Sequence, residues 1–345
     1  AMDGAFVAFN NNMAAGSTYT IAPDASDNLF DTATANSITL NSREGVILIP
    51  SSANNRWYTF GYNKFATQAE MATGTETTPR AMSPLLVTQA IAAPAAGAIN
   101  GFRLSLTTAL PVTTADVIGA TTIYAVPMTG TFISLYNGTN WNLRSSAEFS
   151  LALGTLTSGL PYDIFCYDNA GTPTLEFLAW TNDTIRATAL VRQDGILSKT
   201  GALTRRYLGT FYTTSTTQTE DSFAKRFLWN YYHRVMRPMK VVETTANWTY
   251  STAAFQQARA TGTNQLDCVI GVAEVMVSAN VHVTVSNTAV RDCAVGIGLD
   301  SITVNSAWIF GGSVTATGVN PGQDCFYSGY PAVGRHYLVW LERSE

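Results

Sequence analysis

The chain has 345 residues, 46% of them hydrophobic, which is a globular composition and excludes a wholly disordered protein. Asp, Glu, Lys and Arg together make up only 13%, whereas about 25% is usual in soluble domains. The 24 acidic residues outnumber the 20 basic ones, so the net charge is −4. Without a basic field, nucleic acid is not expected as a partner. No apolar stretch reaches the roughly 20 residues that span a bilayer, so membrane insertion is not expected either.

Short strands are predicted along most of the chain. Runs rich in β-branched and aromatic residues recur about every 8 to 12 residues and are separated by Gly, Asn, Asp, Pro and Ser, which is typical of sandwiches and barrels. The runs are SITL, GVILIP, RWYTFGY, GFRLSL, TTIYAVPM, FISLYNG, WNLRS, YDIFCYDNAG, TLEFLAW and RATALV. Asn137-Gly138 predicts a hairpin with a type I′ turn, and residues 168–171 and 194–195 carry similar turn signals.

Residues 65–93 are the exception to the strand pattern. The piece ATQAEMATG favours a short helix that ends at Gly74, and SPLLVTQAIAA favours a second helix with Ser83 as N-cap and Pro84 at its first position. The apolar faces of these helices are too narrow to form a core alone, so they are expected to pack against copies of themselves as a trimer collar. The collar residues are Met71, Leu85, Leu86 and Ile91.

The start of the predicted helices at residue 65 and two composition changes divide the chain into four parts. APAAGAIN at 93–100 is a linker of small residues, and a second boundary is predicted near 237–245. The predicted parts are an N-terminal β-region at 1–64, the collar and linker at 65–98, a β-rich middle domain at 99–237 and a C-terminal β-sandwich domain at 238–345. The predicted fold is therefore all-β, with consecutive sandwich or jelly-roll-like domains and a short helical collar.

Alternation in the C-terminal part predicts strands with one buried face. The buried positions are expected to be Val275, Val277, Val281, Val283 and Val285. The solvent face is expected to hold Ser278, His282, Thr284 and Ser286.

The segment FATQAEMATGTETTPRAMSPLLVTQAI resembles one that recurs in tailed-bacteriophage fibre proteins. The matching positions are Ala66, Glu70, Gly74, Thr78, Ala81 and Pro84. The stretch beginning GFRLSLTTALPVTT, its continuation from PYDIFCYDNAG, and the later pieces FLWNYYHRV, WTY and GRHYLVWLE are similar to a module of phage and prophage structural proteins. The resemblance spans roughly 65–345 and implies a homotrimeric virion fibre or spike that assembles with other virion proteins.

Histidine and cysteine give little sign of a metal or cofactor, and none is predicted. His233, His282 and His336 are scattered, although a trimer axis could gather three copies of His233 or His336 around an ion. Ordinary hydrogen-bonded histidines are the favoured interpretation. The cysteines lack zinc-knuckle spacing and are expected to be buried free thiols: Cys166, Cys268, Cys293 and Cys325.

Hydrolysis of a polysaccharide would need two carboxylates in a groove, about 5 Å apart or about 6.5–9.5 Å apart. The candidates are Asp163, Asp168, Glu176, Asp183, Glu220 and Asp221. Turn capping explains Asp168 equally well, and a favourable charge at a helix N-terminus explains Glu220 and Asp221. The chain is therefore predicted not to be an enzyme.

Aromatic residues offer two kinds of binding surface. The dense cluster in FLWNYYHR could stack on sugars, but a junction between two domains is favoured: Phe227, Trp229, Tyr231, Tyr232, His233 and Arg234. Trp248, Tyr250 and Trp340 are interpreted as core residues. The Gly-rich loop 305–330 is the predicted receptor-binding element, through Trp308, Phe310, Phe326, Tyr327 and Tyr330.

The resulting prediction is adhesion to a host surface receptor, a glycan, through distal loops and without a chemical step. Three weak sites on one trimer would gain avidity, because the second and third contacts are intramolecular. Two alternatives stay open at this point. One is a purely structural head fibre, capsid decoration or connector, and the other is a polysaccharide depolymerase tailspike.

Overall fold

The computed structural model describes residues 7–10, 17–21, 28–29, 38–41, 45–51, 56–63, 99–287, 290–307, 313–314 and 320–344. The chain divides into two compact units, Ala1–Ala95 and Ala96–Glu345. Every regular element in the described residues is a strand, apart from the 3₁₀ turn η2 (Ala258–Ala260). The all-β prediction is confirmed, whereas jelly-roll topology and trimeric assembly stay predictions. The predicted collar, with Met71, Leu85, Leu86 and Ile91, lies outside the described residues.

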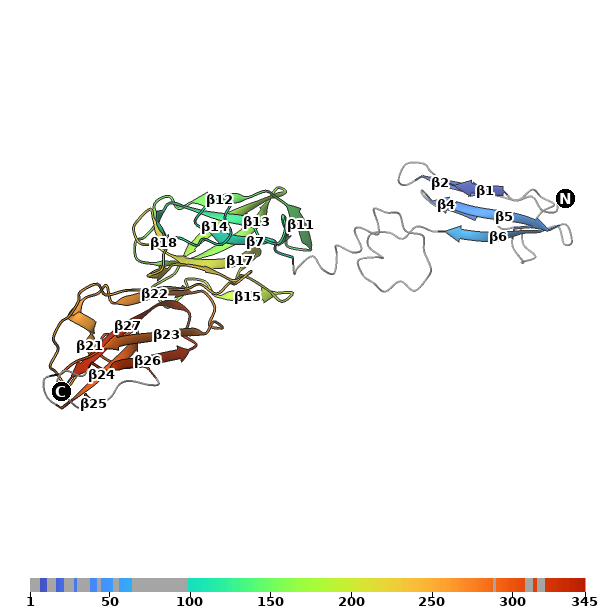
Figure 1. Ribbon diagram of the computed structural model, residues 1–345. Coiled ribbons are helices and arrows are strands. Elements are labelled where there is room, and N and C mark those ends of the chain that lie inside the picture. The colour runs from blue at the N-terminus through green and yellow to red at the C-terminus, as the bar shows by residue number, and fades with distance from the viewer. Residues whose placement is uncertain are drawn as a thin grey trace. The chain divides into compact units, whose positions relative to one another are not determined.

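The described residues of the first unit form short strands. They are β1 (Val7–Asn10), β2 (Thr18–Ile21), β3 (Asn28–Leu29), β4 (Ile38–Asn41), β5 (Gly45–Ser51) and β6 (Arg56–Asn63), of which β4, β5 and β6 match the predicted runs SITL, GVILIP and RWYTFGY. One sheet has the order β1-β5-β6-β3, and β2 pairs with β4 (Figure 1). The predicted runs GVILIP and RWYTFGY form β5 and β6, which pair antiparallel.

The second unit holds the remaining strands. Those before residue 238 are β7 (Phe102–Ser105), β8 (Val117–Ala120), β9 (Thr122–Pro127), β10 (Phe132–Tyr136), β11 (Trp141–Ser145), β12 (Phe149–Ala152), β13 (Pro161–Asn169), β14 (Thr172–Ala179), β15 (Leu190–Gln193), β16 (Ile196–Lys199), β17 (Ala202–Tyr212), β18 (Thr219–Asp221), β19 (Lys225–Arg226) and β20 (Leu228–Asn230). Those after it are β21 (Gln256–Gln257), β22 (Gln265–Ile270), β23 (Val277–Thr284), β24 (Arg291–Leu299), β25 (Ser313–Val314), β26 (Gly322–Gly329) and β27 (Gly334–Ser344). The described part of the chain contains no helix long and apolar enough to cross a membrane.

Two of the predicted hairpins close through two-residue turns. Ala170 and Gly171 join β13 to β14 with φ of 49° and 96°, and Asp194 and Gly195 join β15 to β16 with φ of 50° and 85°. Positive φ at both central positions defines the type I′ turn, whose twist matches that of the paired strands. These turns fix the register of both hairpins.

The third hairpin, β10–β11, is also confirmed, but its predicted turn type is wrong. Tyr136 pairs with Trp141, so four residues form the loop. Asn137 is not in the positive-φ region, and its side-chain oxygen accepts hydrogen bonds from the backbone N–H groups of Thr139 and Asn140, both at 2.8 Å. An Asx-type turn thus replaces the type I′ turn.

The middle sheet of the second unit is buried on both faces. Its order is β14-β13-β17-β16-β15, and β20 pairs with β17. One face packs on the sheet β12-β9-β7 through residues that include Ile164, Leu208 and Phe211. The other face contributes Phe165 and Tyr207 to a second cluster. Packing on both faces explains why β13 is buried continuously from Pro161 to Cys166 rather than at alternate positions.

One sheet joins residues on both sides of position 238. Its order is β25-β24-β27-β22-β19-β18-β8, with β21 paired to β27. The connection is the parallel pairing of β19 with β22, in which Lys225 lies opposite Asp267 and Arg226 opposite Cys268. The predicted boundary near 237–245 therefore lies between strands that share a sheet.

The predicted alternation in the C-terminal part is confirmed for β23. Val277, Val281 and Val283 are half-buried and pack on a core formed by β24, β26 and β27, whereas Ser278 and His282 are exposed. The core residues are Val295, Ile297, Cys325, Tyr327 and Leu338. This packing leaves the opposite face of β23 and β26 toward solvent (Figure 1).

Candidate functional site

The predicted receptor-binding residues separate into three groups. Trp308 and Phe310 lie outside the described residues. Phe326 and Tyr330 are 44% and 70% exposed, whereas Tyr327 is 7% exposed and belongs to the core. The expectation of a loop over 305–330 is wrong for residues 322–329, because they form strand β26. Neighbouring residues of a strand point to opposite faces, so Phe326 and Tyr327 cannot share a surface.

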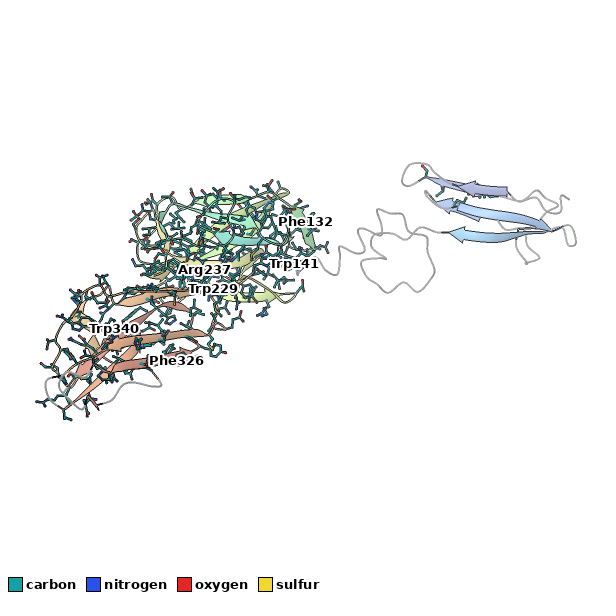
Figure 2. The ribbon with its side chains drawn as sticks, in the orientation of Figure 1. Phe132, Trp141, Trp229, Arg237, Phe326 and Trp340 are labelled. Atoms are coloured by element: carbon teal, nitrogen blue, oxygen red, sulfur yellow. The ribbon has the colours of Figure 1, made fainter. Side chains whose placement is uncertain are left out.

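Phe326 lies on a solvent-facing surface that we call the outer face. Its members are Ser278, Asn280, His282, Thr284, Asp324, Phe326 and Ser328. The antiparallel register places Asn280 opposite Phe326 and His282 opposite Asp324. His282 Nδ1 and Asp324 Oδ1 are 2.7 Å apart. Figure 2 labels Phe326 on this strand pair.

Only part of the outer face was identified from the sequence. The sequence predicted Phe326 as a binding residue and Ser278, His282 and Thr284 on the solvent face, but it did not indicate Asn280, Asp324 and Ser328. The signal was present, because Asp324 and Phe326 alternate with the buried Cys325 and Tyr327 in the same way as β23 alternates.

The aromatic cluster at 227–234 lies where residues from the two sides of position 238 meet, as predicted. Trp229 is buried with Phe165, Tyr207 and Val269, and Tyr231 packs against the same cluster. Figure 2 labels Trp229 in this region. The guanidinium of Arg234 lies 4.9 Å from the Trp229 ring centre. These rings stabilise the junction and leave little aromatic surface there for a ligand.

Trp248 and Trp340 also have a structural role. Both are half-buried, and their rings meet edge to face with centres 5.5 Å apart. The indole N–H of Trp248 donates to Glu342 on β27. This contact attaches the chain after residue 238 to the terminal strand.

Three of the candidate catalytic acids, Asp163, Asp168 and Glu176, each pair with an arginine. The Asp168 carboxylate accepts from Arg144 at 2.6 Å, and Glu176 accepts from Arg205 at 2.8 Å. Burial alone would raise the pKa of Glu176, but hydrogen bonds from Arg205 and Lys199 outweigh it and lower the pKa. These arrangements favour structural pairing over proton transfer.

Asp163 is the most deeply buried of these acids. Arg186 Nε donates to its Oδ2 at 2.8 Å, and Thr210 Oγ1 donates to its Oδ1 at 2.8 Å. Arg186 also donates to the backbone carbonyl of Gly271, which lies beyond position 238. Burial raises the pKa of Asp163, although Arg186 opposes that shift. The pair therefore connects the middle sheet to the C-terminal strands.

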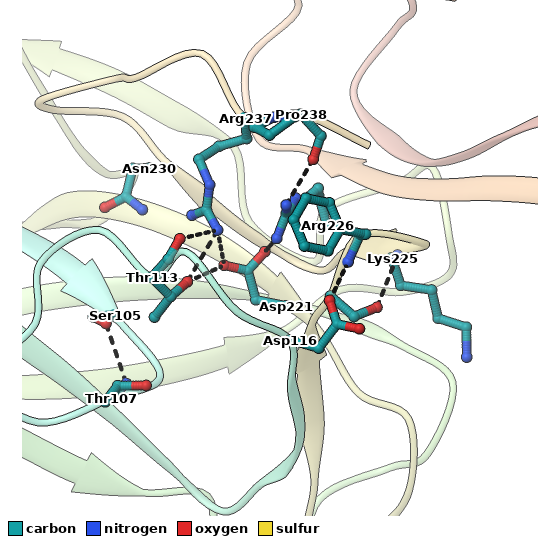
Figure 3. A network of polar contacts seen from close by, with 12 residues as sticks. Ser105, Thr107, Thr113, Asp116, Asp221, Lys225, Arg226, Asn230, Arg237 and Pro238 are labelled. Atoms are coloured by element: carbon teal, nitrogen blue, oxygen red, sulfur yellow. Dashed lines mark hydrogen bonds and ion pairs between the residues drawn. The ribbon is translucent and has the colours of Figure 1, made fainter. Parts of the chain in front are cut away.

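Asp221 is the centre of a second charged network, shown in Figure 3. Arg226 and Arg237 contact its two carboxylate oxygens at 3.2 and 3.0 Å. Arg237 also donates to the carbonyl of Thr113 at 3.1 Å, and Arg226 donates to the carbonyl of Pro238 at 2.6 Å. The helix N-terminus considered for Glu220 and Asp221 is wrong, since both lie in β18. The network holds the chain where it passes from β20 toward the C-terminal strands.

The histidines and cysteines take ordinary structural positions. His336 Nδ1 and Nε2 lie 2.7 Å from Asp300 and 2.9 Å from the carbonyl of Ala332. His233 contacts the carbonyl of Asn100. All four cysteines are buried free thiols, as predicted. In the described part of the chain, no three His, Cys, Asp or Glu side chains cluster in a way that could hold a metal ion.

Comparison with known proteins does not assign the chain to a family. No protein-family model matches it, and no significant match was found among curated proteins. The resemblance to phage fibre proteins therefore stays a prediction.

Proposed function

We propose that this chain is a tailed-bacteriophage virion fibre or spike protein that adheres to a host surface glycan as a homotrimer. The resemblance over roughly 65–345 supports the virion assignment. The charge-poor all-β fold is compatible with it, because many short strands bury surface with few ion pairs. Low surface charge also leaves hydroxyl and amide groups available for hydrogen bonds to sugars.

The observation that carries the adhesive role is the contrast between the paired acids and the outer face. The candidate catalytic acids Asp163, Asp168 and Glu176 are held by arginines. The outer face presents an exposed ring, an amide and hydroxyl groups on a rigid strand pair. Side chains held by a sheet bind with little loss of conformational freedom. This arrangement suits recognition without a chemical step.

A homotrimer would multiply this weak recognition. The three outer faces of one trimer would bind the same cell, so the second and third contacts would form at high effective concentration. Sedimentation of the purified chain is expected to give three times its 37.1 kDa mass. A species of about 37 kDa at micromolar concentration would remove the trimer from the proposal.

Adhesion is tested by adding the purified chain to host bacteria before the phage. Bound protein and slower phage adsorption are the expected results. Antibody labelling of intact particles distinguishes an adhesin from a purely structural protein. A label on the capsid, together with no binding of the purified chain to cells, indicates a structural head fibre. New reducing ends after incubation with host polysaccharide would instead indicate a depolymerase.

A further inference from the structure

We propose that the outer face of β23 and β26 binds a neutral oligosaccharide, with Phe326 as stacking platform and with Asn280 and the His282–Asp324 pair as hydrogen-bonding groups. This inference rests on the proposed adhesive function and names its ligand class and its residues. It also moves recognition from the predicted loop to the face of a strand pair.

The surroundings of Phe326 distinguish the outer face from a protein-docking patch. The ring is 44% exposed. The other members of the outer face are serine, threonine, asparagine, histidine and aspartate, and none is aliphatic. Protein interfaces concentrate apolar side chains at their centre. Within β23 and β26, Phe326 is the one exposed Phe, Tyr or Trp ring and has polar neighbours on both strands, which matches a sugar with one apolar face and a rim of hydroxyls.

The polar groups have unused hydrogen-bonding capacity. The Asn280 amide is exposed and has no side-chain partner among the described residues. The contact between His282 Nδ1 and Asp324 Oδ1 leaves His282 Nε2 and Asp324 Oδ2 without a partner in the same part of the chain. A sugar hydroxyl both donates and accepts, and these groups together offer donors and acceptors.

The strand geometry places these groups at a spacing suited to a sugar ring. Asn280 lies directly opposite Phe326, and Cβ atoms of such pairs are about 4.5–5.5 Å apart. The His282–Asp324 pair is the next pair on the same face, about 7 Å along the strands. A pyranose on the Phe326 ring would therefore have Asn280 at one edge and the His282–Asp324 pair at another. On the other side of the Asn280–Phe326 pair lie the hydroxyls of Ser278 and Ser328, 3.3 Å apart.

Charge selects among glycans. Neither β23 nor β26 contains Lys or Arg, and Asp324 contributes a negative charge. Uronic acids, sialic acids and phosphorylated sugars would meet this like charge and would find no Lys or Arg on either strand. The ligand class that fits is therefore a neutral oligosaccharide.

The test compares the full chain with single variants on immobilised oligosaccharides. The probes are neutral oligomers of glucose, galactose, mannose and N-acetylglucosamine, and acidic oligomers that contain glucuronic or sialic acid. Phe326→Ala and Asn280→Ala are each expected to weaken binding to a neutral probe by roughly five- to tenfold. Phe132→Ala is the matched control, because Phe132 is also a strand phenylalanine, 46% exposed, at the start of β10. The control is expected to bind like the unmodified chain.

Three outcomes would overturn the inference. One is binding of acidic probes only, and another is equal binding by Phe326→Ala and the unmodified chain. The third is self-association through this face, seen as a smaller oligomer for Phe326→Ala than for Phe132→Ala.

If the unmodified chain binds host cells but Phe326→Ala binds them equally well, this inference fails and the adhesive function stands. If the unmodified chain does not bind host cells, the proposed function fails as well. Matching thermal melting curves show that each variant is folded.

Discussion

The contact between the buried His336 and the partly exposed Asp300 makes the stability of the second unit depend on pH. His336 lies on β27, and both of its ring nitrogens face acceptors, the Asp300 carboxylate at 2.7 Å and the Ala332 carbonyl at 2.9 Å. A neutral imidazole has only one N–H, so one of these contacts would place a lone pair against an oxygen. The geometry therefore favours the doubly protonated, cationic ring.

The pKa values agree with this geometry. Burial alone lowers the pKa of His336, but the hydrogen bonds to Asp300 and Ala332 and the charge of Asp300 outweigh it and raise the pKa above 6.5. A raised histidine pKa stabilises the fold below the unfolded value of 6.5, and that contribution is lost as the pH rises through the folded pKa. Asp300 behaves in the opposite sense, because its pKa is lowered below 3.8 by His336, despite its burial. The pair thus stabilises most between about pH 4 and about pH 6.5.

Asp300→Asn isolates the charge in this pair. The amide oxygen can still accept from the Tyr337 N–H, which lies 3.0 Å from Asp300 Oδ1. Asparagine also tolerates the φ of 54° at this position. A hydrogen bond to a charged group contributes about 1.5–3 kcal/mol. Because the Asp300 side chain is 41% exposed, solvent screening puts the expected loss near the lower limit, about 1–1.5 kcal/mol at about pH 5.5.

Urea unfolding curves at about pH 5.5, 7 and 9 measure the effect. The difference between Asp300→Asn and the unmodified chain is expected to shrink toward zero at the highest pH, because His336 is then neutral in both. Asp324→Asn is the control, since His282 and Asp324 are also 2.7 Å apart but are 65% and 75% exposed. Exposed pairs contribute at most about 1 kcal/mol and often nothing. An Asp300→Asn cost that is independent of pH, or equal to the Asp324→Asn cost, would refute the reasoning.

Three further predictions concern the buried polar groups and the turns. Arg186→Ala leaves Asp163 buried without its partner and is expected to lower the free energy of unfolding by about 3 kcal/mol; a loss below about 1 kcal/mol in urea titration would contradict this. The four thiols are expected not to react with Ellman's reagent at about pH 8 until urea is added, because all four are buried and burial raises the pKa of Cys166 and Cys268 to about 12. Gly195→Ala is expected to lower the free energy of unfolding by about 1 kcal/mol, because φ is 85° at that position. Gly130→Ala is the control and is expected to leave it unchanged, because φ is ordinary there and nothing lies within 4 Å of the added Cβ.

Local signals predicted the strands well where composition and turns agree. WNLRS coincides with β11, Trp141–Ser145, and the glycines at 171 and 195 mark two of the hairpin turns. The type I′ turn predicted from Asn137-Gly138 was wrong because the same dipeptide also fits a four-residue loop. The loop length was decided by the pairing of Tyr136 with Trp141, whose rings lie 5.4 Å apart.

Long-range pairing explains what the sequence did not predict. Residues 322–329 are Gly-rich enough to suggest a loop, yet they pair with β23 over eight positions. That partner lies about forty residues earlier in the chain, and no local propensity encodes the choice of partner. The contacts of Asp163 with Arg186 and of Asp267 with Arg335 could not be predicted from local sequence either, since they join residues 23 and 68 positions apart.

The low charge of the chain explains why its acids were poor guides to function. With 13% charged residues, a carboxylate is scarce, and those at Asp163 and Asp221 each anchor basic side chains beside the segments that join the two sides of position 238. Charges used in this way are removed from the surface, and hydroxyls and amides remain there to interact with solvent. A surface of that composition offers a ligand hydrogen bonds and ring stacking rather than ion pairs. The proposed binding site therefore rests on the exposed Phe326 and the polar groups of the outer face, and not on the buried carboxylates of Asp163 and Asp221.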